Sequence, residues 1–87
     1  MDDFADRVEV CAQVLAEAAR TAGMTVSADG RVSEADAAAL LGVAAGTLKN
    51  WRTQGEGPPS YATALAGCRR SYRLSHLASW IECGLER

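Results

Sequence analysis

The stretch VSEADAAALLGVAAGTLKNWRTQGEGPP, residues 32–59, decides the fold that we expect for this chain of 87 residues. Near its start, Ser33 is followed three residues later by the acid Asp36, a variant of the capping box that opens helices. The alanine-rich run that follows favours a short helix, which we expect to end near Leu41. Gly42 then begins a tight turn, because glycine readily adopts the conformation that ends a helix.

A second helix is predicted over residues 44–54, with Gly55 as its C-terminal stop. Two short helices joined by a three- or four-residue turn that contains glycine form the helix-turn-helix pattern. At about 100° per residue, the side chains of Ala44, Leu48 and Trp51 fall on one side of this helix. We therefore assign that side to the core.

The opposite side of the second helix presents hydrogen-bond donors, an amide and a glycine, and it carries no carboxylate. A solvated helix face, which is the alternative interpretation, normally mixes charges of both signs. In the major groove lysine can reach guanine acceptors and asparagine can bridge adenine, while glycine lets a backbone approach closely. We predict a recognition helix that contacts DNA through Gly46, Lys49, Asn50 and Thr53, with Thr47 and Arg52 at its edges near phosphates.

A hairpin is predicted after the second helix. Two prolines exclude further helix there, and two short strand candidates follow at residues 60–61 and 71–73. This places Arg69 and Arg70 at or beside the hairpin tip. We predict a wing in which this pair, helped by Arg73, grips the minor groove or its phosphates. The alternative is a pair of surface arginines that keep an edge hairpin soluble.

Two further helices are predicted outside the deciding stretch. Residues 3–22 carry apolar side chains at spacings of three and four, begin with capping aspartates and stop at Gly23. Residues 76–83 form a closing helix that Ser75 caps. The segment between the first helix and the deciding stretch contains Asp29 followed by a glycine, a tight-turn signal, and is expected to be a small hairpin or an extended linker.

The aromatic side chains are expected to be mostly structural. Trp51 and Trp80 fall on apolar helix stripes, so we assign both to the core. Tyr61 and Tyr72 sit at strand positions and are expected to pack under the wing. His76 follows the capping serine of the last helix and is expected at the surface.

The formal net charge of −2 conceals an uneven distribution along the chain. Residues 1–45 carry three arginines against eight acidic residues, net −5. Residues 46–80 carry five basic residues against Glu56 alone, net +4. The chain is therefore a dipole, and nucleic acid would be attracted to its basic part.

Other classes of function find little support in the sequence. The chain has one histidine and none of the phosphate-loop, Gly-x-Ser-x-Gly or His-Glu-x-x-His motifs, so we expect neither an enzyme nor a cofactor. The spacing of Cys11, Cys68, His76 and Cys83 fits no compact zinc pattern and no disulfide framework. No run approaches the roughly 20 apolar residues that span a bilayer, and the acidic N-terminus is unlike a signal peptide. We expect a cytoplasmic protein of a prokaryotic or phage-infected host, with no membrane partner.

The deciding stretch resembles the excisionase-like, MerR-type winged helix-turn-helix family, which includes small phage regulators of the AlpA type. The shared pattern is Ala-Ala-x-x-Leu-Gly-Val-x-x-x-Thr-Leu-x-x-Trp-x-x-x-Gly-x-Gly-Pro-Pro, and RSYRLSHLASWI, residues 70–81, is similar to the wing strand and closing helix of that family. The resemblance covers residues 32–82. It implies a recognition helix at 44–54 and a wing near 62–70, and the base-reading positions of the family fall on Gly46, Lys49, Asn50 and Thr53.

We therefore expect a mostly α fold with a small β-hairpin wing, a winged helix-turn-helix preceded by an extra N-terminal helix. Residues 1–31 form that helix and a short hairpin or linker packed on the rest, and residues 32–87 form the DNA-binding domain. The expected function is sequence-specific binding of double-stranded DNA, by resemblance as an excisionase that assists an integrase, or as a small transcriptional regulator. A module this small binds DNA weakly, so a homodimer or a cooperative array on DNA is expected.

Two alternatives keep different parts of this interpretation. The chain can instead act as a protein-interaction module through helix 3–22, whose polar side is acidic. It can also be the DNA-recognition module of a phage packaging complex, which would keep the DNA contacts and change the task.

Overall fold

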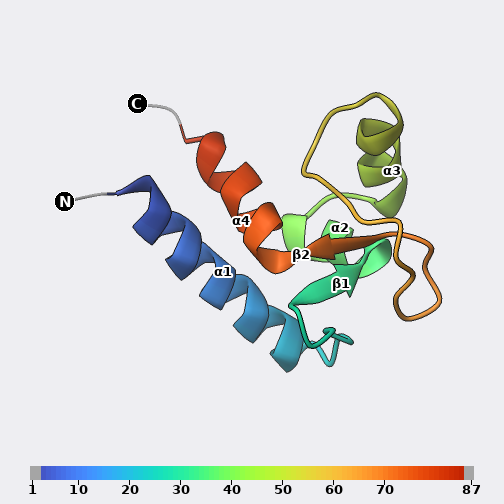
Figure 1. Ribbon diagram of the computed structural model, residues 1–87, viewed down its shortest axis with the longest axis horizontal. Coiled ribbons are helices and arrows are strands. Elements are labelled where there is room, and N and C mark those ends of the chain that lie inside the picture. The colour runs from blue at the N-terminus through green and yellow to red at the C-terminus, as the bar shows by residue number, and fades with distance from the viewer. Residues whose placement is uncertain (1–2, 86–87) are drawn as a thin grey trace.

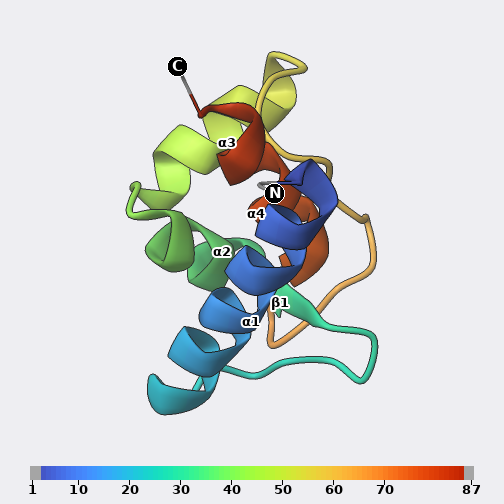
Figure 2. The ribbon, with the colours of Figure 1, turned by 90° about the vertical axis from the view of Figure 1, so that its left-hand side faces the viewer.

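The computed structural model describes residues 3–85 and shows a small, mostly helical globule of four helices and one two-stranded antiparallel sheet (Figure 1). The elements in chain order are α1 (Phe4–Thr21), β1 (Arg31–Ser33), α2 (Glu34–Leu41), α3 (Ala45–Thr53), β2 (Ser71–Arg73) and α4 (Leu74–Cys83). α1 packs along α4 at one end of the molecule, whereas α3 lies at the opposite end (Figures 1 and 2). No helix in residues 3–85 has the length and apolar character needed to cross a membrane.

The first helix forms where its caps and apolar spacing predict it. The carboxylate of Asp3 accepts a hydrogen bond from the amide of Ala5, and Gly23 adopts a left-handed φ of 72° just beyond the helix. Leu15 and Ala19 are buried one turn apart, on the side that faces the rest of the molecule. The predicted long N-terminal helix is confirmed.

The two short helices of the deciding stretch also form as predicted. The Ser33 hydroxyl accepts a hydrogen bond of 3.1 Å from the Asp36 amide, which caps the start of α2. Gly42 then takes a left-handed φ of 77° and turns the chain toward α3. The prediction that Ala44 belongs to the core is wrong, because this residue precedes α3 and is exposed.

The sheet differs from the hairpin expected at residues 60–73. β2 forms, but its partner is β1, some forty residues earlier, and Tyr61 contributes only an isolated bridge to Ser71. The register pairs Val32 with Tyr72, and both side chains are fully shielded from solvent. Burying these two large apolar groups on one face of the sheet stabilises this pairing more than the exposed alternative would.

The last helix begins earlier than the capping pattern predicts. α4 starts at Leu74, and Ser75 lies exposed within its first turn and does not cap it. The helix starts directly at the end of β2. Its first amide, that of Leu74, donates a 2.8 Å hydrogen bond to the carbonyl of Gly30. The buried Leu74 side chain belongs to the core, which favours this start over one set by a serine cap.

The core is small and lies where the sheet meets α1, α2, α3 and α4. Its largest fully buried side chains are Tyr72, Leu48 and Leu77. Trp51 packs against this cluster, but Trp80 is 37% exposed, so its assignment to the core is wrong. The two indole rings lie against each other with centroids 5.2 Å apart, so Trp80 packs on Trp51 while part of its ring stays exposed.

Candidate nucleic-acid interface

The outward side of α3 is polar and accessible. Leu48 is only 1% exposed and holds the helix against the core. On the other side, Gly46, Lys49 and Asn50 are all exposed. Leu48 therefore fixes which face of this short helix points outward, because one deeply buried side chain sets its rotation.

The exposed glycine leaves the start of this face open. No atom lies within 4 Å of the position that a side chain on Gly46 would occupy. The backbone of α3 can therefore be approached closely there. Thr47 is half-buried, at the edge of the face as predicted.

The polar groups of this face differ in how far they are already occupied. Within residues 3–85, Lys49 has no ion-pair partner. The Thr53 hydroxyl donates a 3.0 Å hydrogen bond to the backbone carbonyl of Asn50, and Asn50 itself is exposed. Lys49 and Asn50 are thus the two long polar side chains of α3 that are available to an incoming ligand.

Arg52, predicted to lie near phosphates, has a partner within the protein. Its guanidinium binds the Glu34 carboxylate through two hydrogen bonds, of 2.8 Å and 3.3 Å, and the two side chains are only 21% and 15% exposed. The Tyr72 hydroxyl donates a 2.9 Å hydrogen bond to the same carboxylate. We call these three residues the Glu34 joint, since they tie α3 to the first turn of α2 and to β2.

The electrostatics of the Glu34 joint reflect its partial burial. The hydrogen bonds from Arg52 hold the pKa of Glu34 below its usual value, and the bond from Tyr72 acts in the same direction. Burial, followed by the hydrogen bond to Glu34, raises the pKa of Tyr72 to about 12. At neutral pH the joint therefore holds a charged carboxylate, a charged guanidinium and a neutral phenol.

The segment at residues 62–70 carries the other predicted contacts. Leu65 and Cys68 bond to each other through both backbone groups, at 3.0 Å each, around a two-residue turn. Ala66 and Gly67 have φ values of 52° and 85°, the left-handed pair that such tight turns require. The tip is therefore at residues 66–67, and Arg69 comes directly beside it, exposed.

This segment is anchored to the sheet at its base. The Ser71 hydroxyl donates to the carbonyl of Thr63 at 2.9 Å and accepts from the guanidinium of Arg31 at 2.7 Å. Tyr61 and Ser71 exchange two backbone hydrogen bonds, of 2.8 Å and 3.0 Å. Arg69 and Arg70 therefore extend from a segment whose two ends are fixed to β2.

Arg73, the third arginine predicted to contact DNA, is engaged inside the protein. Its guanidinium pairs with Asp29 at 3.2 Å and lies 5.1 Å from the centre of the Tyr61 ring. The ring of His76 stacks against Tyr61 at 5.8 Å, so this histidine is half-buried rather than free at the surface. Hydrogen bonds from Ser27, then Arg31 and Arg73, hold the pKa of Asp29 far below its usual value. Arg73 therefore fastens the turn before β1 to β2.

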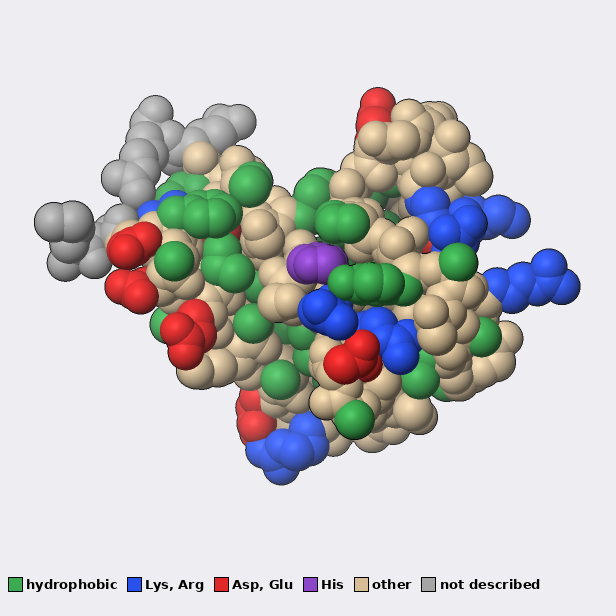
Figure 3. Space-filling view, in the orientation of Figure 1, with side chains coloured by type: hydrophobic (Ala, Val, Ile, Leu, Met, Phe, Trp, Pro, Cys, Tyr) green, Lys and Arg blue, Asp and Glu red, His purple; other side chains and the backbone are tan. Residues whose placement is uncertain are grey.

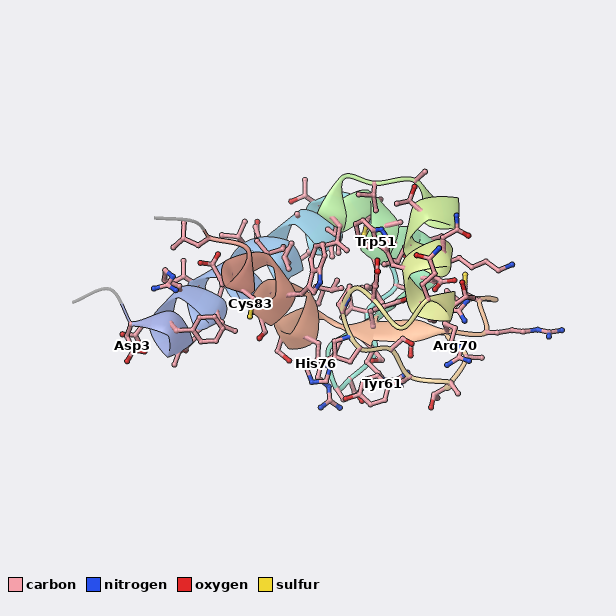
Figure 4. All side chains as sticks on the ribbon, turned by 90° about the horizontal axis from the view of Figure 1, so that it is seen from above. Asp3, Trp51, Tyr61, Arg70, His76 and Cys83 are labelled. Carbon is pink, nitrogen blue, oxygen red and sulfur yellow. The ribbon has the colours of Figure 1, made fainter. Side chains whose placement is uncertain are left out.

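The predicted contact residues come together at one end of the molecule. Basic side chains extend from the end that holds α3 and the 62–70 segment, whereas acidic side chains gather over α1 (Figure 3). Seen from above, Arg70 lies at the opposite end from Asp3 and Cys83, along a molecule 41 Å in its longest extent (Figure 4). Lys49 and Asn50 on α3, and Arg69 and Arg70 in the 62–70 segment, thus belong to the elements at this end, and Arg52 is held there by Glu34.

Glu34 is the residue of this region that the sequence did not reveal. In the charge pattern it is only one of the eight acids of the N-terminal half. Its position in the first turn of α2 is explained by the helix dipole alone, so the sequence contains no signal for its pairing with Arg52.

Within residues 3–85, no group of three His, Cys, Asp or Glu side chains could hold a metal ion.

Comparisons of the chain with protein-family models, with curated proteins and with solved structures gave no significant match. The function of the α3 surface must therefore be inferred from the geometry and charge of its own residues.

Proposed function

We propose that this protein binds double-stranded DNA, with α3 in the major groove and the 62–70 segment as a wing against the neighbouring backbone or minor groove. The observation that carries the proposal is that basic side chains extend from the end of the molecule that holds α3 and the 62–70 segment, where Lys49, Asn50 and Arg69 are exposed and Arg70 is half-buried. An α-helix fits the width of the major groove, and lysine and asparagine match base edges there. In this proposal α2 and α3 act as a helix-turn-helix, and the 62–70 segment acts as its wing.

Each residue has a stated role in this proposal. Lys49 and Asn50 contact base edges, and Gly46 lets the helix approach closely. Arg69 and Arg70 contact phosphates or the minor groove. Arg52 and Arg73 serve as positioning residues, because their guanidinium groups already hold Glu34 and Asp29.

The proposed task is architectural or regulatory. The protein marks or bends a DNA site, as an excisionase does beside an attachment site or as a small transcriptional regulator does at a promoter. In either case the binding energy is used to hold or deform DNA, and this chain makes and breaks no bond.

The proposal makes a quantitative prediction for how the affinity for DNA depends on salt concentration. If Arg69 and Arg70 neutralise one phosphate each, and the charge of Lys49 neutralises one more beside the base edge that it contacts, the logarithm of affinity falls against the logarithm of salt with a slope of about −3. A slope near −5 would require Arg52 and Arg73 to leave their carboxylate partners.

The experiment is a titration of duplex DNA fragments at several salt concentrations, monitored by fluorescence anisotropy. We expect the triple variant Lys49→Ala, Arg69→Ala, Arg70→Ala to lose roughly 100-fold in affinity at low salt, together with most of the salt slope. Arg20→Ala is the matched control, since Arg20 is an exposed arginine on α1. Its affinity for DNA should stay within about twofold of the parent.

Two results would contradict the proposal. One is the absence of salt-sensitive binding to any duplex by the parent protein. The other is an equal loss for the triple variant and for Arg20→Ala, because binding would then depend on overall charge and not on the α3 surface.

A further inference from the structure

At the end of the molecule away from α3, the side of α1 next to α4 holds an open groove of about 460 Å³. We call it the α1 groove, and its lining residues are Asp6, Arg7, Val10, Cys11, Val14 and Glu82. Val10 and Val14 are 59% and 61% exposed, although they are apolar and one helical turn apart. Phe4, at the start of the same helix, is also largely exposed. α1 lies in front of α4 when the molecule is viewed from this end (Figure 2), so the helix is accessible there.

The charges of the α1 groove lie along the same face of the helix. Asp6, Val10 and Val14 are spaced by four residues and form one row, and Glu17 continues it three residues later. The row therefore has an apolar centre and an acid at each end, roughly 16 Å apart at the rise of an α-helix. Within residues 3–85, Asp6 has no ion-pair partner, whereas Glu17 pairs with Arg20.

The floor of the groove is held in place by α4. Arg7 pairs with Glu82 at 3.1 Å, both side chains are only 20% exposed, and the Arg7 guanidinium lies 5.6 Å from the centre of the Phe4 ring. Burial, followed by the charge of Glu82, raises the pKa of the Cys11 thiol, which keeps it an apolar part of the floor. The groove is thus a fixed surface between two packed helices.

We propose that the α1 groove binds a basic amphipathic helix of another protein, with two apolar residues for the valine row and a lysine or arginine at each end. A second copy of this chain fits poorly. A parallel pairing through the valines places Asp6 against Asp6, and an antiparallel pairing places Asp6 against Glu17. The first juxtaposes like charges, and in the second Glu17 is already paired with Arg20, so neither arrangement gives both acids a new basic partner, which disfavours a second copy. A basic helix makes the same apolar contacts with opposite charges at both ends. The proposal does not depend on DNA binding, because this groove and the α3 surface lie at opposite ends.

The test uses three synthetic helical peptides of equal length, added to the full chain without DNA. The first has two leucines four positions apart at its centre and lysines toward both ends. The second replaces the lysines by glutamates. The third keeps the lysines and distributes the leucines around the helix. Binding is monitored by fluorescence anisotropy and by amide chemical shifts, and folding of every variant is checked by circular dichroism.

The first peptide is expected to bind and to shift the amides of α1 and of Glu82, while the second does not bind. The double variant Val10→Gln, Val14→Gln should weaken binding at least about tenfold and Asp6→Lys by a similar factor. The matched control Val26→Gln changes an exposed valine outside the groove and should leave affinity unchanged.

Equal binding of the first and third peptides would overturn the proposal, because attraction would then depend on charge alone. A parent protein that is dimeric, and becomes monomeric in the Val10→Gln, Val14→Gln variant, would overturn it in favour of a second copy. A failure to bind DNA would leave these results unaffected, so the two proposals are tested separately.

Discussion

The two ends of this molecule use charged side chains in different ways. Of the five basic residues at positions 46–80, Arg52 is drawn into a half-buried contact with Glu34 and Arg73 into a more exposed one with Asp29, and Lys49 and Arg69 remain exposed. At the α1 end, the exposed acids Asp6 and Glu17 stand beside exposed valines, and Glu17 is paired with Arg20. The formal net charge of −2 averages these opposite surfaces. The comparison teaches that binding properties depend on where charge is left exposed, and that the same residue type can either support a surface or form it.

The largest expected effect tests whether the two ends fold as one unit. Leu48→Ala leaves a cavity beneath α3 and should lower the free energy of unfolding by about 3 kcal/mol. If the core is shared, the amides of α1 lose protection from hydrogen exchange together with those of α3. Loss of protection in α3 alone, with α1 and α4 unchanged, would show that the two ends unfold independently.

The next effect concerns Tyr72, which lies between the two ends. Because its pKa in the folded state, about 12, lies above the value of about 10 in an unfolded chain, the folded state holds the proton more tightly. This stabilisation is complete below pH 10 and is lost as the pH rises from 10 toward 12, by roughly 2.5 kcal/mol at most.

Denaturant titrations across that range measure the loss. The variant Tyr72→Phe should be less stable at neutral pH and should lose the part of the alkaline dependence that this phenol contributes. An unchanged alkaline profile in this variant would argue against the burial and hydrogen bond assigned to Tyr72.

A matched pair of arginines sharpens the comparison directly. Arg52→Ala removes the partner of a half-buried carboxylate and should cost about 2 kcal/mol. Arg20→Ala breaks the exposed pair with Glu17 and should cost less than about 0.5 kcal/mol. Thermal or chemical unfolding measures both. Equal costs would mean that the Glu34 joint contributes no more than a surface ion pair.

The smallest effect has the opposite sign. Gly46 is helical and a side chain there meets no atom within 4 Å, so Gly46→Ala should stabilise the protein by about 0.5–1 kcal/mol. If the backbone of α3 approaches DNA at this position, the same change should weaken DNA binding. A gain in stability with unchanged affinity for DNA would remove Gly46 from the proposed contact surface.

Local signals predicted the helices well. The Ser33 cap, the turn at Gly42 and the placement of Leu48 each depend on a few neighbouring residues, and all three appear in the structure. The outward position of Lys49 is set by Leu48 through helical spacing alone.

Contacts between distant segments could not be predicted in this way. The pairing of Val32 with Tyr72 joins residues forty positions apart. The sequence of a short strand does not specify which other strand it pairs with. The same holds for Arg52, whose charge predicts a phosphate contact until the position of Glu34 is known. The predicted start of α4 is wrong because a buried Leu74 outweighs the serine signal.

Each strand of the sheet continues into a helix without a connecting residue: Ser33 ends β1 where α2 begins, and Arg73 ends β2 where α4 begins. Adding or deleting one residue at either junction would rotate the helix after it by about 100° and turn its inward side away from its neighbours. The longer connections at residues 22–30 and 54–70 can vary in length without this rotation. The second of these segments carries Arg69 and Arg70, so lengthening or shortening it would move these two arginines relative to α3 while α1 and α4 keep their positions.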